Sequence, residues 1–298
     1  MTYLSPEGPL PPNPVLQGLG VCDPHVRVFG DRLFLYATHD KGPGNTDFVM
    51  EDWWIWSSGN LRTWKHECTL RPETTYMGAG FASCWATDAA ERNGRYYWYL
   101  SEGSRRTGVV VSDTPTGPWR DPLGGPLLDE GLAPSGAYDP GVFVDADGAP
   151  YIVFGVWDYY LARLGEDMIS LAGPPRKLTV LDPEGPYGAG KLDDKPYLHM
   201  RGGLYYLSWG CFYAISDKLH GPYECQGSII REESVAEHLR YVGRPITFDR
   251  HGSFFEWRGQ WCFACNDMSQ TGDEHFRDTS ICPIRYSSAG LIEPVLIR

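Results

Sequence analysis

The sequence predicts an all-β fold, a five-bladed β-propeller of four-stranded antiparallel blades around a central channel. Three observations carry this prediction. A strand, turn and strand pattern recurs five times, the recurrences are almost evenly spaced, and long amphipathic helical patterns are absent from the sequence.

Each recurrence has the form of a β-hairpin: a short strand, a turn with glycine, and a second strand rich in aromatic or β-branched residues. The five hairpins are VRVFGDRLFLYATH (26–39), AAERNGRYYWYLSE (89–102), GVFVDADGAPYIVFG (141–155), YLHMRGGLYYLSWG (197–210) and SFFEWRGQWCFACN (253–266). Their turn glycines are 64, 54, 55 and 56 residues apart, at Gly30, Gly94, Gly148, Gly203 and Gly259. This spacing indicates an internal repeat.

Between the hairpins lie further strand-like segments that also resemble one another. They are WIWSSGNLRTWKHE, GVVVSDTPTGPWRD, YYLARLGEDMISLAG, CFYAISDKLHGPYECQG and SICPIRYSSAGLIEP. Each unit therefore holds about four strands in about 55 residues, which is typical of a propeller blade. A β-sandwich is the structural alternative, but it does not explain a four-stranded unit repeated five times.

The composition fits one globular domain over residues 1–298, with a proline-rich segment at 1–20. Of the 298 residues 42% are hydrophobic and 21% charged, and no apolar run approaches the roughly 20 residues that cross a bilayer. The N-terminus lacks the basic start and apolar core of a secretory signal, so we expect a cytoplasmic protein.

The net charge of −12 argues against nucleic acid or an anionic membrane as a partner, because both require a cationic face. The sequence leaves the oligomeric state open. Eight cysteines lie in strand-like segments without the spacing of a disulfide framework, and we expect free, mostly buried thiols. Aromatic residues make up 14% of the chain and include eleven tryptophans, which suit stacking on sugar rings or the packing of blades.

Acidic residues stand just ahead of four hairpins, and a histidine stands ahead of the fifth. In a propeller the first strand of each blade lines the channel, so residues at its start gather at one mouth. They are Asp23, Asp88, Asp139, Asp194 and His251. Asp-Pro can also simply begin a strand. Several carboxylates around one axis, however, cost free energy and are typical of a glycosidase site.

The chain resembles glycoside hydrolase family 43 from about Asn13 to the C-terminus. The resemblance rests on the order and spacing of NPVLQGLGVCDPHV, YATHD, CWATDAAERNGRYYWY, VVVSDTPTGPW, YDPGVFVDADGAPY, DDKPYLHMRGGLYYLSWG, AISDKLHGPY and HGSFFEWRGQW. The family consists of five-bladed propeller enzymes that remove arabinofuranosyl or xylosyl units from plant polysaccharides by inversion.

The resemblance implies roles for three acids. Asp23 matches the general base, and Asp139 matches the acid that orients the general acid and adjusts its pKa. The general acid of the family is a Glu that opens blade four, whereas the register here, counted back from Gly203, gives Asp194. Glu184, in PEGPYGAG, is the alternative acid.

The resemblance also implies contacts with the substrate. The candidate residues are His39, Trp85, Asp88, Trp209, His251 and Arg277. Core packing is the alternative for Trp85, and a surface salt bridge is the alternative for Arg277. His251 matches a channel histidine that binds Ca²⁺ or a water cluster, and a channel histidine without metal is the other interpretation. No cofactor is required.

We therefore expect an inverting exo-glycosidase that removes a terminal pentose from plant-type oligo- or polysaccharides. α-L-Arabinofuranose is favoured, because THDKGPGNTDFVMEDWWIW resembles the arabinofuranosidase branches of the family. β-D-Xylose and galactofuranose are the alternative sugars, and the sequence shows no accessory β-sandwich. The competing class is a sugar-binding propeller without activity, since an Asp stands where the family has Glu.

Overall fold

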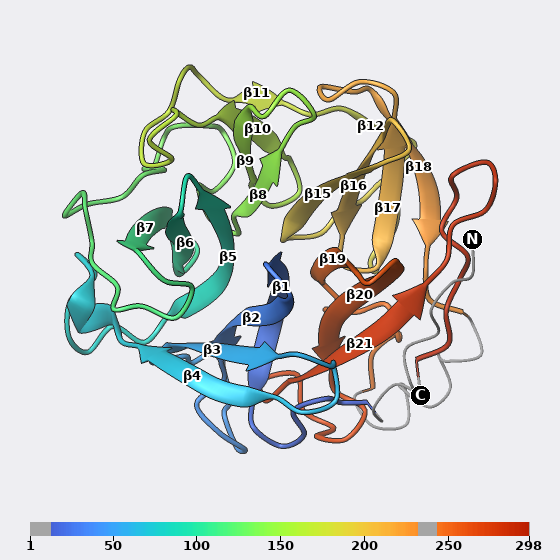
Figure 1. Cartoon of the computed structure of the whole chain (residues 1–298). Coiled ribbons are helices and arrows are strands. Elements are labelled where there is room, and N and C mark those ends of the chain that lie inside the picture. The colour runs from blue at the N-terminus through green and yellow to red at the C-terminus, as the bar shows by residue number, and fades with distance from the viewer. Residues whose placement is uncertain (1–12, 232–242, 298) are drawn as a thin grey trace.

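The computed structural model describes residues 13–231 and 243–297, and within them five small β-sheets stand in a ring (Figure 1). The predicted five-bladed β-propeller is confirmed. In each blade the chain starts at the centre and moves outward by antiparallel neighbours. The innermost strands β1, β5, β8, β15 and β19 contact one another in turn around the ring.

The strands fall into five sets. Blade one holds β1 (Val21–Phe29), β2 (Arg32–His39), β3 (Trp53–Ser58) and β4 (Lys65–Leu70). Blade two holds β5 (Cys84–Arg92), β6 (Arg95–Glu102) and β7 (Arg106–Ser112). Blade three holds β8 (Gly141–Val144), β9 (Pro150–Phe154), β10 (Tyr160–Arg163) and β11 (Arg176–Lys177). Blade four holds β15 (Pro196–Arg201), β16 (Leu204–Trp209), β17 (Phe212–Ser216) and β18 (Tyr223–Ser228). Blade five holds β19 (Gly252–Trp257), β20 (Gln260–Asp267) and β21 (Asp278–Ile284).

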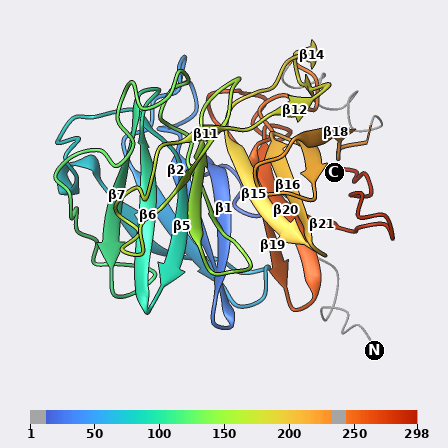
Figure 2. The ribbon, with the colours of Figure 1, turned by 90° about the horizontal axis from the view of Figure 1, so that it is seen from above.

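Three shorter strands and one helical turn complete the elements. β12 (Val180–Leu181) pairs parallel with β18 on the outside of blade four. β13 (Glu184–Gly185) and β14 (Gly188–Ala189) form a separate small hairpin, and η1 is a 3₁₀ turn (Pro72–Thr74). Figure 2 shows this hairpin at the end of the ring opposite to the turns that join the inner two strands of the blades.

Blades two and five depart from the predicted four strands, because each has three among the described residues. In blade two the expected outer segment makes only isolated bridges, such as Val111 with Arg120. Pro115, Pro118 and Pro122 interrupt this segment, and proline cannot donate a ladder hydrogen bond.

In blade five the start of the described chain takes the outer position. The amide of Val15 donates to the carbonyl of Thr279 at 2.8 Å, and Asn13 exchanges two side-chain hydrogen bonds with the backbone of Ile281. The ring is therefore closed between the beginning and the end of the sequence. The proline-rich residues 1–12 lie outside the described part of the chain.

The core lies between neighbouring blades, because the inner strands alternate buried side chains toward each side. Tyr36, Trp53 and Trp98 fill the layer between blades one and two, and Leu35 packs with Phe255 between blades one and five. All eight cysteines are unpaired, as predicted, and six of them are buried. Among the described residues, no helix is long and apolar enough to cross a bilayer.

Candidate active site

Three blades begin with the same backbone feature, a residue of positive φ followed by proline. Asp23 has φ 50°, Asp139 φ 59° and Lys195 φ 53°. The left-handed conformation costs a residue with a side chain roughly 1–2 kcal/mol, although Asp tolerates it better than most. Lys195, not Asp194, is therefore the structural equivalent of Asp23 and Asp139, and Asp194 reaches the centre from the position before it.

A pocket of about 150 Å³ opens where these strands begin. We call it the acidic pocket, and its lining residues are Asp23, Phe48, Met50, Trp85, Ala86, Tyr138, Asp139, Asp194, Asp249, His251 and Arg277. Pockets for drug-sized ligands measure roughly 300–1,000 Å³, so this one has room for a single small ring. The predicted carboxylates of Asp23, Asp139 and Asp194 meet here.

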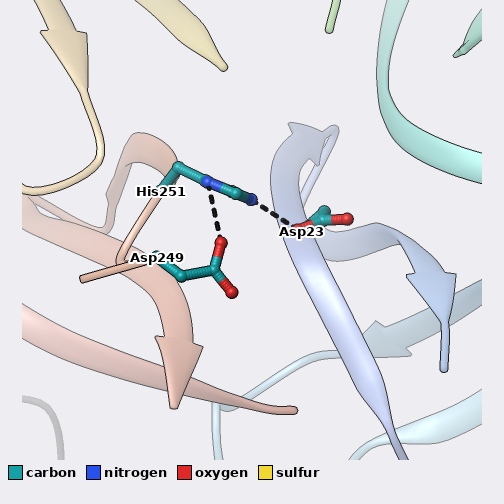
Figure 3. Close-up of side chains that lie close together, drawn as sticks. All are labelled: Asp23, Asp249 and His251. Carbon is teal, nitrogen blue, oxygen red and sulfur yellow. Dashed lines mark hydrogen bonds and ion pairs between the residues drawn. The ribbon is translucent and has the colours of Figure 1, made fainter. Parts of the chain in front are cut away.

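Three donors fix the carboxylate of Asp23 through its Oδ1 atom. His251 Nε2 lies at 2.5 Å (Figure 3). Asn266 Nδ2 lies at 3.0 Å and Arg277 Nη1 at 3.1 Å. Burial raises the pKa of Asp23, but the charges of Arg277 and His251 outweigh it and hold this pKa well below its usual range. Asp23 is therefore an ionised carboxylate, with Oδ2 as the oxygen that can face a water molecule.

Arg277 is a buried guanidinium that holds three acids in place. It donates to both oxygens of Asp40, at 3.0 and 3.1 Å, and its Nη1 lies 3.1 Å from Asp249 as well as from Asp23. The surface salt bridge that the sequence left open for Arg277 is wrong, since only 3% of its side chain is exposed.

Asp139 has a different environment from Asp23. Its amide donates to Ser101 Oγ at 3.0 Å, and its Oδ2 accepts the amide of Lys195 at 3.2 Å. Burial, followed by the negative charge of Asp194, raises the pKa of Asp139 to about 8. Asp139 therefore holds a proton near neutral pH.

Asp194 is the acid that faces solvent, with 40% of its side chain exposed. Its Oδ1 lies 3.2 Å from His251 Nδ1, and Asp249 Oδ1 lies 3.3 Å from the same nitrogen. Burial lowers the pKa of His251, but the charges of Asp249, Asp23 and Asp194 raise it well above its usual value. One imidazole ring thus stands between the carboxylates of Asp23 and Asp194.

The neighbouring Asp193 points away from the acidic pocket and is buried. Burial and the charge of Asp194 raise the pKa of Asp193 to about 8. Asp139 and Asp193 therefore each retain a proton near neutral pH in this group of three close carboxylates, Asp139, Asp193 and Asp194, because close carboxylates cannot all ionise.

Charged residues fill the channel beneath the acidic pocket. The ammonium of Lys195 is buried and bonds to the carbonyls of Thr87 and Pro140, the latter at 2.5 Å. The guanidinium of Arg27 donates to both oxygens of Asp88 and to the carbonyl of Val142. These contacts join β1, β5 and the start of β8 across the axis.

Four predicted candidates lie outside the lining of the acidic pocket. Asp88 is fully buried and forms an ion pair with Arg27. The ring of His39 stacks on that of Trp54, with centroids 3.6 Å apart, and its Nδ1 pairs with Asp52. The indole of Trp209 is buried and donates to the carbonyl of Glu184. The side chain of Glu184 does not line the acidic pocket. The side chain of His39 is 19% exposed, and its contact with sugar stays a prediction. Asp88 and Trp209 are fully buried and their polar atoms bond within the protein, so they do not reach the acidic pocket. Glu184 is likewise not placed as the alternative acid.

The sequence argument missed several residues of the site. Asp249 and Tyr138 line the acidic pocket, and Asp40 anchors Arg277 from below. Asp249 stands two residues before His251 and Tyr138 directly before Asp139, so a search around the predicted positions could have found both. Asp40 is the last residue of the YATHD motif, but nothing in the sequence indicates its pairing with Arg277.

The cluster of Asp23, Asp249 and His251 resembles a metal site in composition. Their ligand atoms lie within 4.8 Å of one another. Arg277 Nη1, however, lies 3.1 Å from an oxygen of each carboxylate and already supplies the positive charge. Ca²⁺ takes six to eight oxygen ligands, water among them, so a calcium ion at His251 would take most of its ligands from water.

Comparison with known proteins yields a consistent group. The model of the family "Glycosyl hydrolases family 43" matches residues 11–292. A xylosidase/arabinosidase of Bacteroides ovatus is 27% identical, over 91% of this chain and 94% of its own. The β-D-galactofuranosidase xynD of Aspergillus niger is 30% identical, over 96% and 85%. The structure of a GH43_1 enzyme from Xanthomonas citri, complexed with xylotriose, superposes with a TM-score of 0.79 at 26% identity, over 95% and 93%.

Proposed function

Because the chain belongs to family 43 of the glycosyl hydrolases, we propose that it removes a terminal pentose from plant-type oligosaccharides with inversion at the anomeric carbon. Membership supports hydrolysis of a glycosidic bond. The observation that carries the finer proposal is the meeting of Asp23, Asp139 and Asp194, from three blades, around one small pocket.

In this proposal Asp23 acts as the general base. Its Oδ2 accepts a proton from a water molecule that attacks the anomeric carbon, while Arg277, His251 and Asn266 hold Oδ1. Inversion places the base and the acid on opposite faces of the sugar, with carboxyl groups roughly 6.5–9.5 Å apart. The imidazole of His251 between Asp23 and Asp194 fits such a gap.

Asp194 acts as the general acid on the departing oxygen. It is the member of the group of Asp139, Asp193 and Asp194 that reaches the sugar, because the other two are buried. A proton retained by this group is available to Asp194 when substrate excludes water from the pocket. Asp139, held by Ser101 and the amide of Lys195, carries such a proton beside Asp194, because burial and the charge of Asp194 raise its pKa to about 8.

The pocket volume supports cleavage at a chain end. About 150 Å³ accommodates one ring, and the charged residues beneath close the channel to a second one. For the sugar we propose α-L-arabinofuranose, with β-D-xylose and galactofuranose as alternatives. The named relatives include a xylosidase/arabinosidase and a galactofuranosidase, and they do not separate these sugars. No step requires a metal ion.

The test is a panel of nitrophenyl glycosides of these three sugars, assayed with the wild type and with Asp23→Asn. We expect the arabinofuranoside to be hydrolysed fastest, and Asp23→Asn to lower kcat by about 10²–10⁴-fold because the base is lost. Proton NMR of the first product should show the inverted anomer. Retention of configuration, or an unchanged rate in Asp23→Asn, would refute the mechanism.

A sugar-binding propeller without hydrolysis is the second candidate. The observation that favours it is the Asp at position 194, which is shorter by one methylene than the Glu of the family. Binding of arabinose or xylose without release of nitrophenol from any glycoside of the panel would establish it.

A further inference from the structure

Three aromatic side chains, two of them exposed, stand together beside the acidic pocket. They are Trp157, Tyr187 and Phe248, which we call the aromatic platform. Trp157 is 52% exposed and Tyr187 45% exposed, and their ring centroids are 5.3 Å apart. Phe248 is half-buried, with its ring 6.4 Å from that of Tyr187. They come from three loops: between β9 and β10, between β13 and β14, and ahead of β19.

The backbone places the three residues close to the acidic pocket. The amide of Trp157 donates to the carbonyl of Asp193, next to Asp194, at 3.2 Å. Phe248 directly precedes Asp249, which lines the pocket. Tyr187 lies close enough for the charges of Asp193, Asp194 and Asp249 to contribute to a raised pKa of its phenol, after burial as the larger cause. The platform is therefore continuous with the pocket on the side of Asp194.

The turn that carries Trp157 is rigid and strained. Trp157 has φ 63°, a left-handed conformation that is a genuine outlier for a bulky residue. Ser135 Oγ bonds to both the amide and the carbonyl of Val156, and the amide of Gly155 donates to Tyr138. Strain of this kind persists where the surrounding contacts enforce it, and it is typical of binding sites. Here it holds an indole half out in solvent.

The hairpin that carries Tyr187 is also fixed from below. The buried indole of Trp209 donates to the carbonyl of Glu184 at 2.8 Å, and the amide of Gly190 donates to Pro183 at 2.7 Å. Figure 2 shows β14 projecting at one end of the ring. Trp209 therefore supports the platform instead of contacting sugar itself.

We propose that the aromatic platform binds the leaving part of the substrate, the first two sugar units beyond the scissile bond of a neutral pentose oligosaccharide. This inference deepens the proposed function and rests on it. Asp194 would protonate the departing oxygen, so sugars that lie beyond Asp194 belong to the leaving group. Aromatic faces stack on the apolar faces of sugar rings. Asp193, Asp194 and Asp249 beside the platform disfavour chains that carry uronic acids.

The experiment compares substrate lengths in matched variants. Trp157→Gly removes the ring and relieves the positive φ, so the fold should tolerate it. Tyr187→Ala removes the second ring. Val144→Ala is the control, because Val144 is 44% exposed at the far end of β8, away from the acidic pocket.

For the wild type we expect kcat/KM to rise about tenfold from the disaccharide to the tetrasaccharide of the preferred pentose, as stacking contacts are added. Trp157→Gly and Tyr187→Ala should each lose most of this rise. The nitrophenyl glycoside occupies only the first leaving position, and its kcat/KM should change by less than about threefold. Val144→Ala should behave as the wild type.

Two outcomes would overturn the platform. One is an unchanged dependence on length in both variants. The other is an equal loss on nitrophenyl glycoside and tetrasaccharide, which would show that the rings act only by supporting Asp193 and Asp194. If the wild type hydrolyses no glycoside, the proposed function fails, but the platform can still be tested. Its binding to the tetrasaccharide is then measured by titration, followed by tryptophan fluorescence. Binding that is weakened in Trp157→Gly then supports the platform, and binding that is absent or unchanged refutes it.

Discussion

Asp23 and Asp139 begin two blades in the same backbone conformation but have opposite electrostatic surroundings. Asp23 faces Arg277 and His251, which hold its pKa well below the usual range despite burial. Asp139 is buried beside Asp194, and its pKa is raised to about 8. The difference arises because Arg277 and His251 lie on the Asp23 side of the pocket. In the proposed reaction this places the base at Asp23 and the acid on the side of Asp139 and Asp194.

The raised pKa of Asp139 makes stability depend on pH. The folded protein keeps a proton that the unfolded chain releases near pH 4, so the free energy of unfolding falls as pH rises from about 4 to about 8. Asp139→Asn removes this contribution. We expect its urea midpoint to fall less than that of the wild type between pH 5 and pH 8.

The exposed Asp113 provides the control for this measurement. Asp113→Asn should follow the wild type at both pH values. A slope that is identical in the wild type and Asp139→Asn would show that Asp139 is ionised in the folded protein. Part of the slope should persist in any case, because the pKa of Asp193 is also raised to about 8.

The role of Asp194 can be separated from that of the base by the leaving group. A departing oxygen of low pKa needs no proton, whereas a sugar hydroxyl does. Asp194→Asn should therefore lower kcat/KM on a disaccharide by about 10²-fold or more and leave a dinitrophenyl glycoside within about fivefold. Glu184→Gln should match the wild type on both substrates. Equal losses on both substrates in Asp194→Asn would contradict its role as acid.

For single residues, the sequence was sufficient to predict which ones meet when they belong to a repeated motif. Asp23 and Asp139 precede proline at the start of a hairpin, so their meeting followed from the propeller. His39 and Trp209 lie outside the lining of the acidic pocket, because a side chain near the end of a strand can turn toward a neighbouring loop, as with Asp52 and Glu184. Arg277 with Asp40 depends on chain segments 237 residues apart, which a single sequence does not reveal.

The elements of the fold were predictable where the hairpin pattern is strong. All five hairpins form the inner strands of the blades, since the turn glycines and alternating apolar residues specify both position and register. The outer strands were not predictable to the same degree. They are short, contain proline and glycine, and owe their pairing to the neighbouring strand more than to their own residues.

The outer position of blade five provides a prediction about stability. The Asn13 side chain makes two hydrogen bonds to the backbone of Ile281, at 2.9 and 3.2 Å. Asn13→Ala should lower the free energy of unfolding by about 1–2 kcal/mol, since Ile281 loses both partners. For a chain of this size we expect Tm to fall by about 2–6 °C in a thermal melt.

Gln17 offers a control on the same segment. Its side chain is exposed and makes only a 3.5 Å contact with Gln270. Gln17→Ala should leave Tm within about 1 °C of the wild type. If Asn13→Ala and Gln17→Ala had the same Tm, the hydrogen bonds of Asn13 to Ile281 would not stabilise the closed ring.

At the scale of the whole molecule, charge is unevenly placed. The chain carries a net charge of −12, yet basic side chains are buried at its centre. Arg27 and Arg277 pair with acids that line the axis, and Lys195 bonds to backbone carbonyls. Arg277 supplies the positive charge of the Asp23, Asp249 and His251 cluster. The protein should therefore work without a metal ion.

Treatment with EDTA, followed by gel filtration, tests this expectation. Activity on the best nitrophenyl glycoside and Tm should both stay unchanged within error. A loss that added Ca²⁺ restores would show that the cluster, or another site in the channel, binds calcium and that Arg277 is not the counter-charge.

The charged seal beneath the pocket has a consequence for the way a polymer would be degraded. Lys195 and the Arg27–Asp88 pair block the axis beneath the pocket. A freed monosaccharide can therefore leave only through the mouth of the pocket, which the rest of the polysaccharide still covers. The enzyme must release the polymer after each cleavage and then bind a chain end again. Degradation would thus be non-processive, with products shortened by one unit accumulating in the medium before any chain is consumed.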